Sequence, residues 1–201
     1  MIIRKVDIAD VPAIVDIHSQ AFPEFFLTTL GSRFLRLYYK CMCTSEEAVT
    51  FCAETEGRVV GFATSSYYSR GFNTTLIKKN PFSFGLMAVE LLFTRPGALL
   101  RLARNLDKKD GGDTVEDAGD YAELYSIAVL PAFQGEGIGK KLLMATEDDV
   151  AKHNRRISLT TDYDHNEKTI GFYHSMGYRD YYAFVTYPDR RMWRLIKEIR
   201  P

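Results

Sequence analysis

Residues 124–143 read Leu-Tyr-Ser-Ile-Ala-Val-Leu-Pro-Ala-Phe-Gln-Gly-Glu-Gly-Ile-Gly-Lys-Lys-Leu-Leu, and this stretch decides the fold. The apolar run up to Val129 predicts a buried strand, Pro131 a turn, and the pattern from Ile138 an amphipathic helix. The connecting loop contains three glycines, Gly135, Gly137 and Gly139. Glycine leaves its backbone N–H uncovered, and the first turn of a helix carries unpaired N–H groups and the positive end of the helix dipole. We therefore expect the loop to bind an anion, and a diphosphate suits it.

Two better-known phosphate loops do not fit this spacing. A Walker loop requires a glycine five residues before its Gly-Lys-Ser/Thr end, but Gln134 stands there and Lys141 replaces the hydroxyl residue. A dinucleotide-binding fingerprint requires its third glycine at position 140, which is Lys140. The spacing that remains is Gln134-x-x-Gly137-x-Gly139 after a strand.

This spacing resembles the acyl-CoA loop of the GCN5-related N-acetyltransferases, the GNAT family. The resemblance implies that the loop binds the coenzyme A diphosphate through Gln134, Gly135, Glu136, Gly137, Ile138, Gly139 and Lys140. It also implies that the strand backbone at Ile127, Ala128 and Val129 pairs with the pantetheine arm. Read alone, the loop is also compatible with an ordinary glycine-rich turn between a strand and a helix.

A second signature lies downstream and resembles the same family: Asn166-x-x-Thr169-x-x-Phe172-Tyr173-x-x-x-Gly177-Tyr178. Thr169 stands where alanine is commonest in the family, and Tyr178 replaces phenylalanine. The resemblance implies that Asn166 contacts the coenzyme A arm and that the Tyr173 hydroxyl lies near its sulfur. It covers residues 121–180 through specific motifs and residues 2–68 through element order alone.

The reaction that the resemblance implies is direct acyl transfer from a thioester to an amine. A free alkylamine has a pKa of roughly 10, so a base must take its proton before it attacks. The departing thiolate gains from a proton donor, and the developing oxyanion from a backbone N–H. The amide of Val129 is the oxyanion donor that the resemblance implies.

Tyr173 is the candidate acid and Glu123 the candidate base. Glu123 lies five residues before Ala128, where several family members carry a catalytic glutamate on the same strand. Strand alternation predicts that it shares a face with Tyr125, Ile127 and Val129. Each residue has an alternative interpretation. Tyr173 is then a buried core aromatic and Asn166 a helix N-cap. Glu123 is then a solvated residue at a strand end, and a water chain serves as the base.

Composition excludes several function classes. The chain has 26 acidic and 26 basic side chains and a formal net charge of zero, so nothing points to nucleic acid or an anionic membrane. We find no signal-peptide pattern at Met1 and no apolar stretch long enough to span a bilayer. Cys41, Cys43 and Cys52 form no disulfide or zinc pattern, so we expect free thiols, a cytoplasmic protein and no bound metal.

We expect an α+β, or mixed α/β, GNAT-like fold: one domain over residues 1–201 with a twisted, mostly antiparallel central sheet of about seven strands flanked by helices. The expected strands are residues 2–6, 49–53, 59–68, 121–129, 157–161, 178–186 and 192–196. The expected helices are 11–22, which Asp10 caps, 29–41, 138–153 and 167–175. An insertion at 69–120 is expected to hold helices at 84–93 and 98–106 and a mobile polar segment at 107–120.

The expected co-substrate is acetyl-CoA, and the expected partner is a small-molecule amine such as an amino sugar, a polyamine or an amino-acid-like amine. Aromatic residues in segments 21–28 and 181–184 and in the insertion suit a hydrophobic or sugar-like acceptor. The alternatives are a protein amine as acceptor, a longer acyl chain, and a non-catalytic coenzyme A sensor; a homodimer is an option. Lys141, Arg155 and Arg156 are further candidates to contact coenzyme phosphates, although such side chains are usually only solvated.

Overall fold

The structure, a computed structural model, describes residues 1–107, 117–187 and 189–200. Its centre is a seven-stranded sheet in the order β1-β2-β3-β4-β5-β7-β6. The strands are β1 (Ile2–Lys5), β2 (Ala48–Thr55), β3 (Arg58–Ser66), β4 (Ala122–Val129), β5 (Arg156–Asp162), β6 (Arg179–Thr186) and β7 (Arg190–Glu198). Neighbours are antiparallel except β4 and β5, which are parallel. The expectation of a mostly antiparallel sheet of about seven strands is therefore confirmed.

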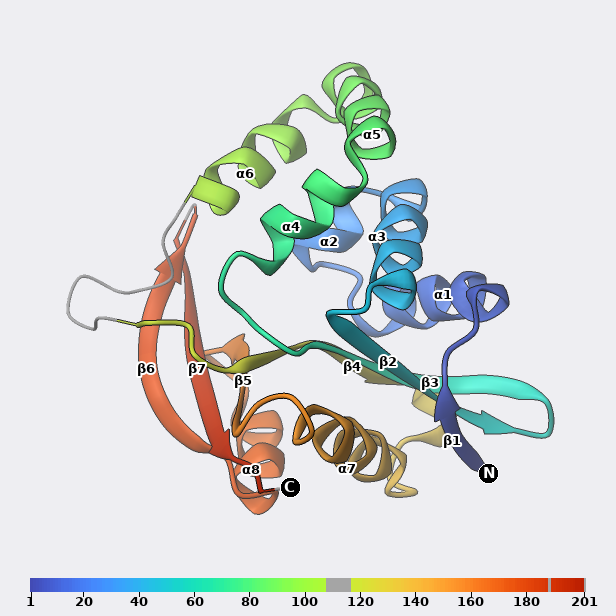
Figure 1. Cartoon of the computed structure of the whole chain (residues 1–201), viewed down its shortest axis with the longest axis vertical. Helices are drawn as coiled ribbons and strands as arrows, with labels where there is room; N and C mark the ends of the chain where they lie inside the picture. Colours follow the sequence, from blue (N-terminus) through green and yellow to red (C-terminus); the bar gives the residue numbers. More distant parts are fainter. Residues whose placement is uncertain (108–116, 188, 201) are drawn as a thin grey trace.

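Helices cover both faces of this sheet (Figure 1). They are α1 (Val11–Ala21), α2 (Phe26–Thr29), α3 (Ser32–Thr44), α4 (Phe72–Lys79), α5 (Pro81–Thr94), α6 (Pro96–Asp107), α7 (Ile138–Val150) and α8 (Glu167–Ser175). In α3 the buried residues recur at helical spacing, as in Leu35, Tyr38 and Met42, and α7 repeats this with Leu142, Leu143 and Val150. Figure 1 shows α1 and α3 on one face of β1–β4 and α7 on the other. No helix among the described residues is long and apolar enough to cross a membrane.

The first helix begins after Asp10, as expected, but without the expected side-chain cap. Asp10 makes no side-chain cap to α1. Instead Asp7 accepts a hydrogen bond from the Ala9 amide at 3.0 Å and starts a short 3₁₀ helix at Ile8–Asp10. The Asp10 carboxylate accepts from Arg4 Nη1 at 2.7 Å, which ties the helix entrance to β1. The prediction of Asp10 at the N-cap position is therefore confirmed, but its carboxylate accepts from Arg4 and from the Asp7 amide instead of capping α1.

The described part of the insertion between β3 and β4 holds three helices rather than the two expected. The missed helix is α4, whose Phe72 and Leu76 lie one turn apart and are 3% exposed each. Its start, Gly71-Phe-Asn-Thr-Thr, has weak helix propensity, so tertiary burial and not local preference forms it. Most of the segment expected to be mobile, residues 108–116, lies outside the described residues. Its end at Asp117 is not loose, because that carboxylate accepts hydrogen bonds from the core.

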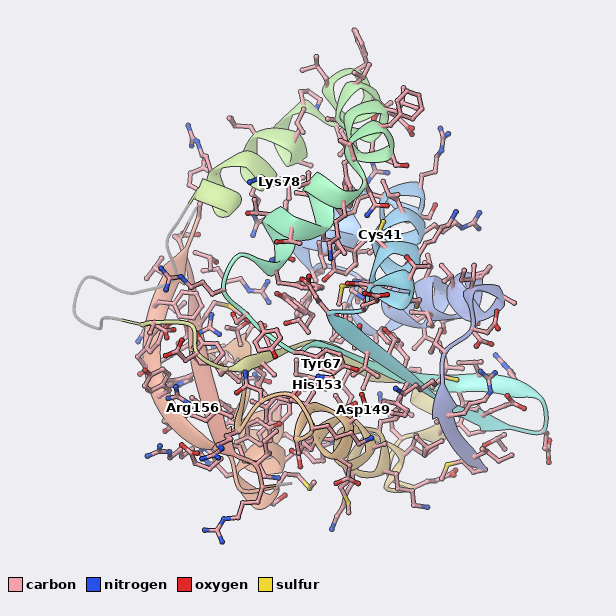
Figure 2. The ribbon with its side chains drawn as sticks, in the orientation of Figure 1. Cys41, Tyr67, Lys78, Asp149, His153 and Arg156 are labelled. Carbon is pink, nitrogen blue, oxygen red and sulfur yellow. The ribbon has the colours of Figure 1, made fainter. Side chains whose placement is uncertain are left out.

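The cysteines behave as expected. All three are free, with Cys41 and Cys52 buried and Cys43 partly buried. Burial raises the pKa of the Cys52 thiol to about 11, so this thiol stays protonated and unreactive near neutral pH. Cys41 is a buried residue of α3 (Figure 2). No cluster of potential metal ligands occurs in the part of the chain that the structure describes.

Candidate functional site

The site begins where β4 and β5 separate. The two strands pair at three positions, the last being Leu124 with Leu159, although β4 continues to Val129 and β5 to Asp162. On its other edge β4 stays paired with β3 as far as Val129. The backbone of residues 126–129 therefore faces β5 without pairing to that strand. An extended ligand arm has main-chain hydrogen-bonding groups available at this edge, which includes Ile127, Ala128 and Val129.

The glycine loop follows directly and joins β4 to α7. Gln134 Nε2 donates to the Val129 carbonyl at 3.2 Å and ties the loop to the strand end. Gly135 and Gly137 have φ of 87° and 74°, the left-handed region that favours glycine. The first backbone hydrogen bond of α7 runs from the Lys141 amide to the Gly137 carbonyl at 3.2 Å.

The amides in this loop have no internal acceptor. None of the backbone N–H groups of residues 135–140 donates a hydrogen bond to a residue that the structure describes. A Cβ placed on Gly135, Gly137 or Gly139 would meet nothing within 4 Å, so the space above these amides is open. A cradle of free N–H groups at the N-terminus of a 13-residue helix fits a diphosphate group.

Tyr173 lies on α8, the helix that follows β5. It is 6% exposed, and its ring packs edge-on against Phe172 and Tyr178 at centroid distances of 5.2 and 5.5 Å. Burial raises the pKa of the Tyr173 phenol well above its ordinary value. The hydroxyl is therefore protonated near neutral pH, which is the state that a proton donor requires.

Asn166 fixes the turn between β5 and α8. Its Nδ2 donates to Thr161 Oγ1 at 2.6 Å and to the Asp162 carbonyl at 3.1 Å. Asn166 occupies the N-cap position of α8, as the alternative interpretation expected, but its side chain makes no capping hydrogen bond. These bonds instead hold the end of β5 against the start of the helix that carries Tyr173.

Glu123 lies on the opposite face from the one that alternation predicts. The pairing of β4 with β3 shifts at Tyr125, so that Thr64 opposes Ser126 while Ser66 opposes Glu123. This bulge adds one residue and reverses the alternation beyond it. Glu123 therefore shares a face with Ser126, which accepts a hydrogen bond from Tyr39 of α3 at 3.3 Å. Val129 lies on the α7 face, so the predicted common face of Glu123 with Ile127 and Val129 was wrong.

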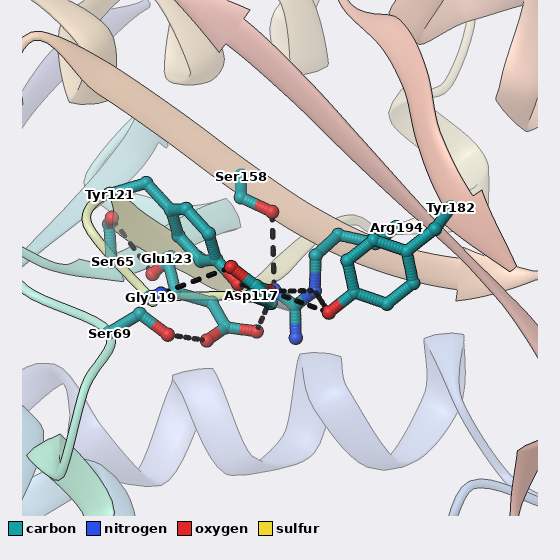
Figure 3. Close-up of polar contacts among 9 residues, drawn as sticks. All are labelled: Ser65, Ser69, Asp117, Gly119, Tyr121, Glu123, Ser158, Tyr182 and Arg194. Carbon is teal, nitrogen blue, oxygen red and sulfur yellow. Dashed lines mark hydrogen bonds and ion pairs between the residues drawn. The ribbon is translucent and has the colours of Figure 1, made fainter. Parts of the chain in front are cut away.

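The carboxylate of Glu123 belongs to a buried charge cluster, defined here as Asp117, Tyr121, Glu123, Tyr182 and Arg194 (Figure 3). Arg194 is 1% exposed and donates to Glu123 Oε1 at 3.1 Å and to the Tyr182 hydroxyl at 3.0 Å. The other oxygen of Glu123 accepts from Ser69 at 2.5 Å. Both carboxylate oxygens are therefore occupied, one by a guanidinium and one by a hydroxyl.

Asp117 supplies the second carboxylate of the cluster, 3.8 Å from Arg194 Nε. It accepts from the hydroxyls of Tyr121 and Tyr182 and from the Gly119 amide at 3.0 Å. Burial alone would raise the pKa of Asp117, but the hydrogen bonds from the two tyrosines outweigh it and hold that pKa below its ordinary value. Because Ser69 and Asp117 stand at the two ends of the insertion, the cluster ties both ends to the sheet.

We expect Arg194→Met to lower the free energy of unfolding by about 3–5 kcal/mol, since two carboxylates would stay buried without their counter-charge. Urea unfolding at neutral pH measures this loss. The matched control is Arg191→Met, whose arginine side chain is 52% exposed and lies 3.6 Å from Asp164; it should stay within about 0.5 kcal/mol of the wild type. Equal effects of the two substitutions would contradict the structural role of the cluster.

An apolar cavity of about 210 Å³ lies beside the bulge in β4. We call it the insertion cavity. Its walls from α2 and α3 are Phe26, Leu27, Phe34 and Tyr38, and its remaining walls are Asn73, Leu76, Ile77, Phe84, Leu102 and Tyr125. Phe72 of α4 also packs on the Tyr125 ring, at a centroid distance of 5.7 Å. Helices α2 and α3, three helices of the insertion and Tyr125 of β4 thus line one apolar space.

Arg155 and Arg156 lie beyond the far end of α7, at the start of β5, and line an open depression of about 570 Å³. Tyr67 anchors this end by stacking on His153 at 3.8 Å and donating to Asp149 at 2.7 Å (Figure 2). A helix as long as α7 spans about 20 Å, and the glycine loop lies at its other end. The two arginines are therefore not placed to bind a diphosphate held by that loop.

Comparisons with known proteins agree with this geometry. A family model described as the acetyltransferase (GNAT) family matches residues 11–178. An uncharacterized N-acetyltransferase of Bacillus cereus is 32% identical over 101 residues, which are 48% of this chain and 55% of that protein. One of Bacillus thuringiensis is 32% identical over 95 residues, 46% of this chain and 52% of that protein. The matches thus span about half of the length of these curated relatives.

Solved structures resemble the whole chain. A ribosomal-protein-alanine N-acetyltransferase from Brucella melitensis aligns with a TM-score of 0.62 and 15% identity, over 99% of this chain and 100% of that one. An N-acetyltransferase from Staphylococcus aureus aligns with a TM-score of 0.60 and 16% identity, over 98% and 97%. At these identities the likeness shows the fold, with its open, seven-stranded sheet.

Proposed function

Because this chain belongs to the acetyltransferase (GNAT) family, we propose that it transfers an acetyl group from acetyl-CoA directly to the primary amine of a small molecule. The observation that carries the proposal is the row of free amides over residues 135–140, at the start of α7 and next to the unpaired edge of β4. A diphosphate on the loop amides places an extended arm along that edge. The oxyanion of the reaction then accepts from the Val129 amide.

In this proposal Tyr173 protonates the departing thiolate. Its buried hydroxyl is protonated at neutral pH, and Asn166 fixes the turn that precedes its helix. The amine nitrogen attacks the thioester carbon, the carbon–sulfur bond breaks, and the sulfur takes the phenolic proton. The second proton that the nitrogen releases then restores the phenol, so the products are an amide and free coenzyme A.

Glu123 is the proposed acceptor of the first amine proton. An alkylamine arrives as an ammonium ion at neutral pH and has to lose a proton before it attacks. Ser69 Oγ lies 2.5 Å from Glu123 Oε2, so the hydroxyl passes the proton from the amine to the carboxylate. Arg194 Nη1 donates to Glu123 Oε1 at 3.1 Å and holds the carboxylate in place, which makes Arg194 a positioning residue for the base.

A thiol-release assay tests the proposal: the protein is mixed with acetyl-CoA and a panel of amines, and free coenzyme A is measured. Amine-dependent release supports it. Stabilisation by acetyl-CoA without release by any small amine or peptide would show a coenzyme A sensor instead. Release with peptide amines alone would assign the activity to protein acceptors.

A further inference from the structure

We propose that the insertion cavity binds the hydrocarbon part of the acceptor, so that the acceptor is a primary amine with an aromatic or branched aliphatic tail. This inference rests on the proposed function. It begins from the lining, which includes no Asp, Glu, Lys or Arg side chain. The cavity of about 210 Å³ exceeds the roughly 150 Å³ of an apolar protein cavity that holds benzene. A phenyl ring with a short linker therefore fits.

The cavity lies beside the proposed reaction centre. Tyr125, one of its walls, is the first residue of β4 beyond the pairing with β5. Glu123 is connected to this wall: it accepts from Ser69 at 2.5 Å, and the Ser69 carbonyl accepts from the amide of Phe72 at 3.2 Å. The Phe72 ring in turn packs on Tyr125. An amine whose tail fills the cavity thus has Glu123 next to its head group.

The same lining disfavours two other acceptor classes. A polyamine would bring a second ammonium ion into a space with no carboxylate in its walls, and an uncompensated buried charge is costly. An amino sugar would bring several hydroxyls, but Asn73 and the phenols of Tyr38 and Tyr125 are the polar side chains of the lining. The apolar walls therefore select a hydrocarbon tail over a charged or hydroxylated one.

The first test compares kcat/KM for four amines: 2-phenylethylamine, 3-methylbutylamine, 1,5-diaminopentane and glucosamine. We expect the first two to exceed the last two by at least about tenfold. Equal or better turnover of the diamine or the sugar would overturn the inference and leave the proposed acetyltransferase function intact. Absence of turnover with every amine would instead contradict the proposed function itself.

The second test places a carboxylate in the cavity wall through Ile77→Asp, a partly buried position on α4. We expect kcat/KM to fall at least about tenfold for 2-phenylethylamine and to rise for 1,5-diaminopentane, whose second ammonium gains a partner. A folding defect would lower kcat/KM for both amines. The control is Leu100→Asp on α6, where the side chain is 52% exposed and does not line the cavity; both rates should stay unchanged. An unchanged preference in Ile77→Asp would overturn the inference.

From a different observation we infer that the outer face of α5 packs against a second copy of the chain. This patch, which we call the α5 stripe, comprises Phe82 (77% exposed), Leu86 (59%), Val89 (56%) and Phe93 (81%). Its spacing of four, three and four residues is that of a helix–helix seam. On the opposite side of the helix Leu91 is buried at 3% exposure. A helix that is apolar on both sides is one that is covered on both sides.

A second copy fits the stripe better than a lipid surface does. Helices that lie on membranes carry Lys and Arg on their polar face, but the only charged residue within α5 is Glu90, which pairs with Arg33 at 3.0 Å. The two exposed phenylalanines offer on the order of 300 Å². With the two aliphatic side chains between them, the stripe offers on the order of 500 Å², which is more than half of the about 800 Å² that each partner buries in a stable interface.

Sedimentation equilibrium of the full chain over a micromolar concentration range tests this inference. We expect a dimer that Phe93→Glu converts to a monomer, because the substitution puts a charge into the seam. The control is Met144→Glu on α7, where the side chain is 46% exposed; it should remain dimeric. A wild-type monomer at all concentrations, or flotation of the wild type with phosphatidylcholine vesicles as a monomer, would overturn it.

Discussion

Gly137→Trp is expected to lose the rise in melting temperature that acetyl-CoA gives the wild-type protein. At a ligand concentration of about 100 Kd, binding adds roughly 2.7 kcal/mol to the stability of the folded state. For a chain of this size that corresponds to a shift of about 5–10 °C. A large side chain at the N-cap of α7 covers the open space above the free amides, so the variant should show no shift. Differential scanning fluorimetry measures both proteins.

The control for this variant has to carry the same backbone cost. Gly137 has φ of 74°, so any other residue there is strained whatever the ligand does. Gly57→Trp places tryptophan at φ 75° in the turn between β2 and β3, also with nothing within 4 Å and outside the glycine loop. It should lose basal stability and keep the full ligand shift. If Gly137→Trp keeps that shift as well, the loop does not hold the diphosphate.

Tyr173→Phe is expected to lower kcat by on the order of 10²- to 10⁴-fold, the range for losing a positioned proton donor. The ring and its packing against Phe172 and Tyr178 remain, so KM for acetyl-CoA and the melting temperature should change little. Steady-state kinetics with the best amine of the panel, together with thermal unfolding, separates the two effects.

The control is Tyr178→Phe, the same substitution on the neighbouring ring. Tyr178 is 3% exposed, and phenylalanine is the residue usual at this place in the second signature. Activity should therefore survive. If Tyr173→Phe retains near-complete turnover, or if Tyr178→Phe loses as much as Tyr173→Phe, then Tyr173 is not the proton donor.

Local sequence patterns predict those elements of the fold whose formation depends mainly on neighbouring residues in the chain. The alternation and apolar runs of β2, β3 and β4 predict those strands, and the helical spacing after Gly137 predicts α7. The glycines at 135 and 137 predict a loop in an unusual conformation, and the structure places both at positive φ. In each case a property of single residue types, either apolar spacing or the freedom of glycine to adopt positive φ, determines the local structure.

The face of Glu123 could not be predicted, because the bulge at Tyr125 has no signature of its own. Residues 121–129 are apolar except for Glu123 and Ser126, and such a run does not show which residue is the inserted one. The shift is visible only in the pairing with β3, at Thr64 and Ser65. Strand register depends on the partner strand, so the sequence of one strand predicts its existence but not which way each side chain points.

The buried charge cluster was not predicted from the sequence for a related reason. Arg194 stands between Trp193 and Leu195 in an interior strand, and an arginine in an apolar run is a signal that it needs a buried partner. Its partners, however, come from β4, β6 and the end of the insertion. Asp117 lies in a polar, glycine-bearing segment that resembles a loose linker. Only the tertiary fold brings this carboxylate to the guanidinium.

The central claim is that the backbone amides of residues 135–140 bind a diphosphate. Amide chemical shifts of the ¹⁵N-labelled protein test it most directly, with coenzyme A compared against pantetheine, which has the same arm but no diphosphate. Coenzyme A should shift the amide signals of residues 135–140 strongly, while pantetheine should leave them in place. Coenzyme A binding that perturbs other amides and leaves these six unmoved would contradict the account.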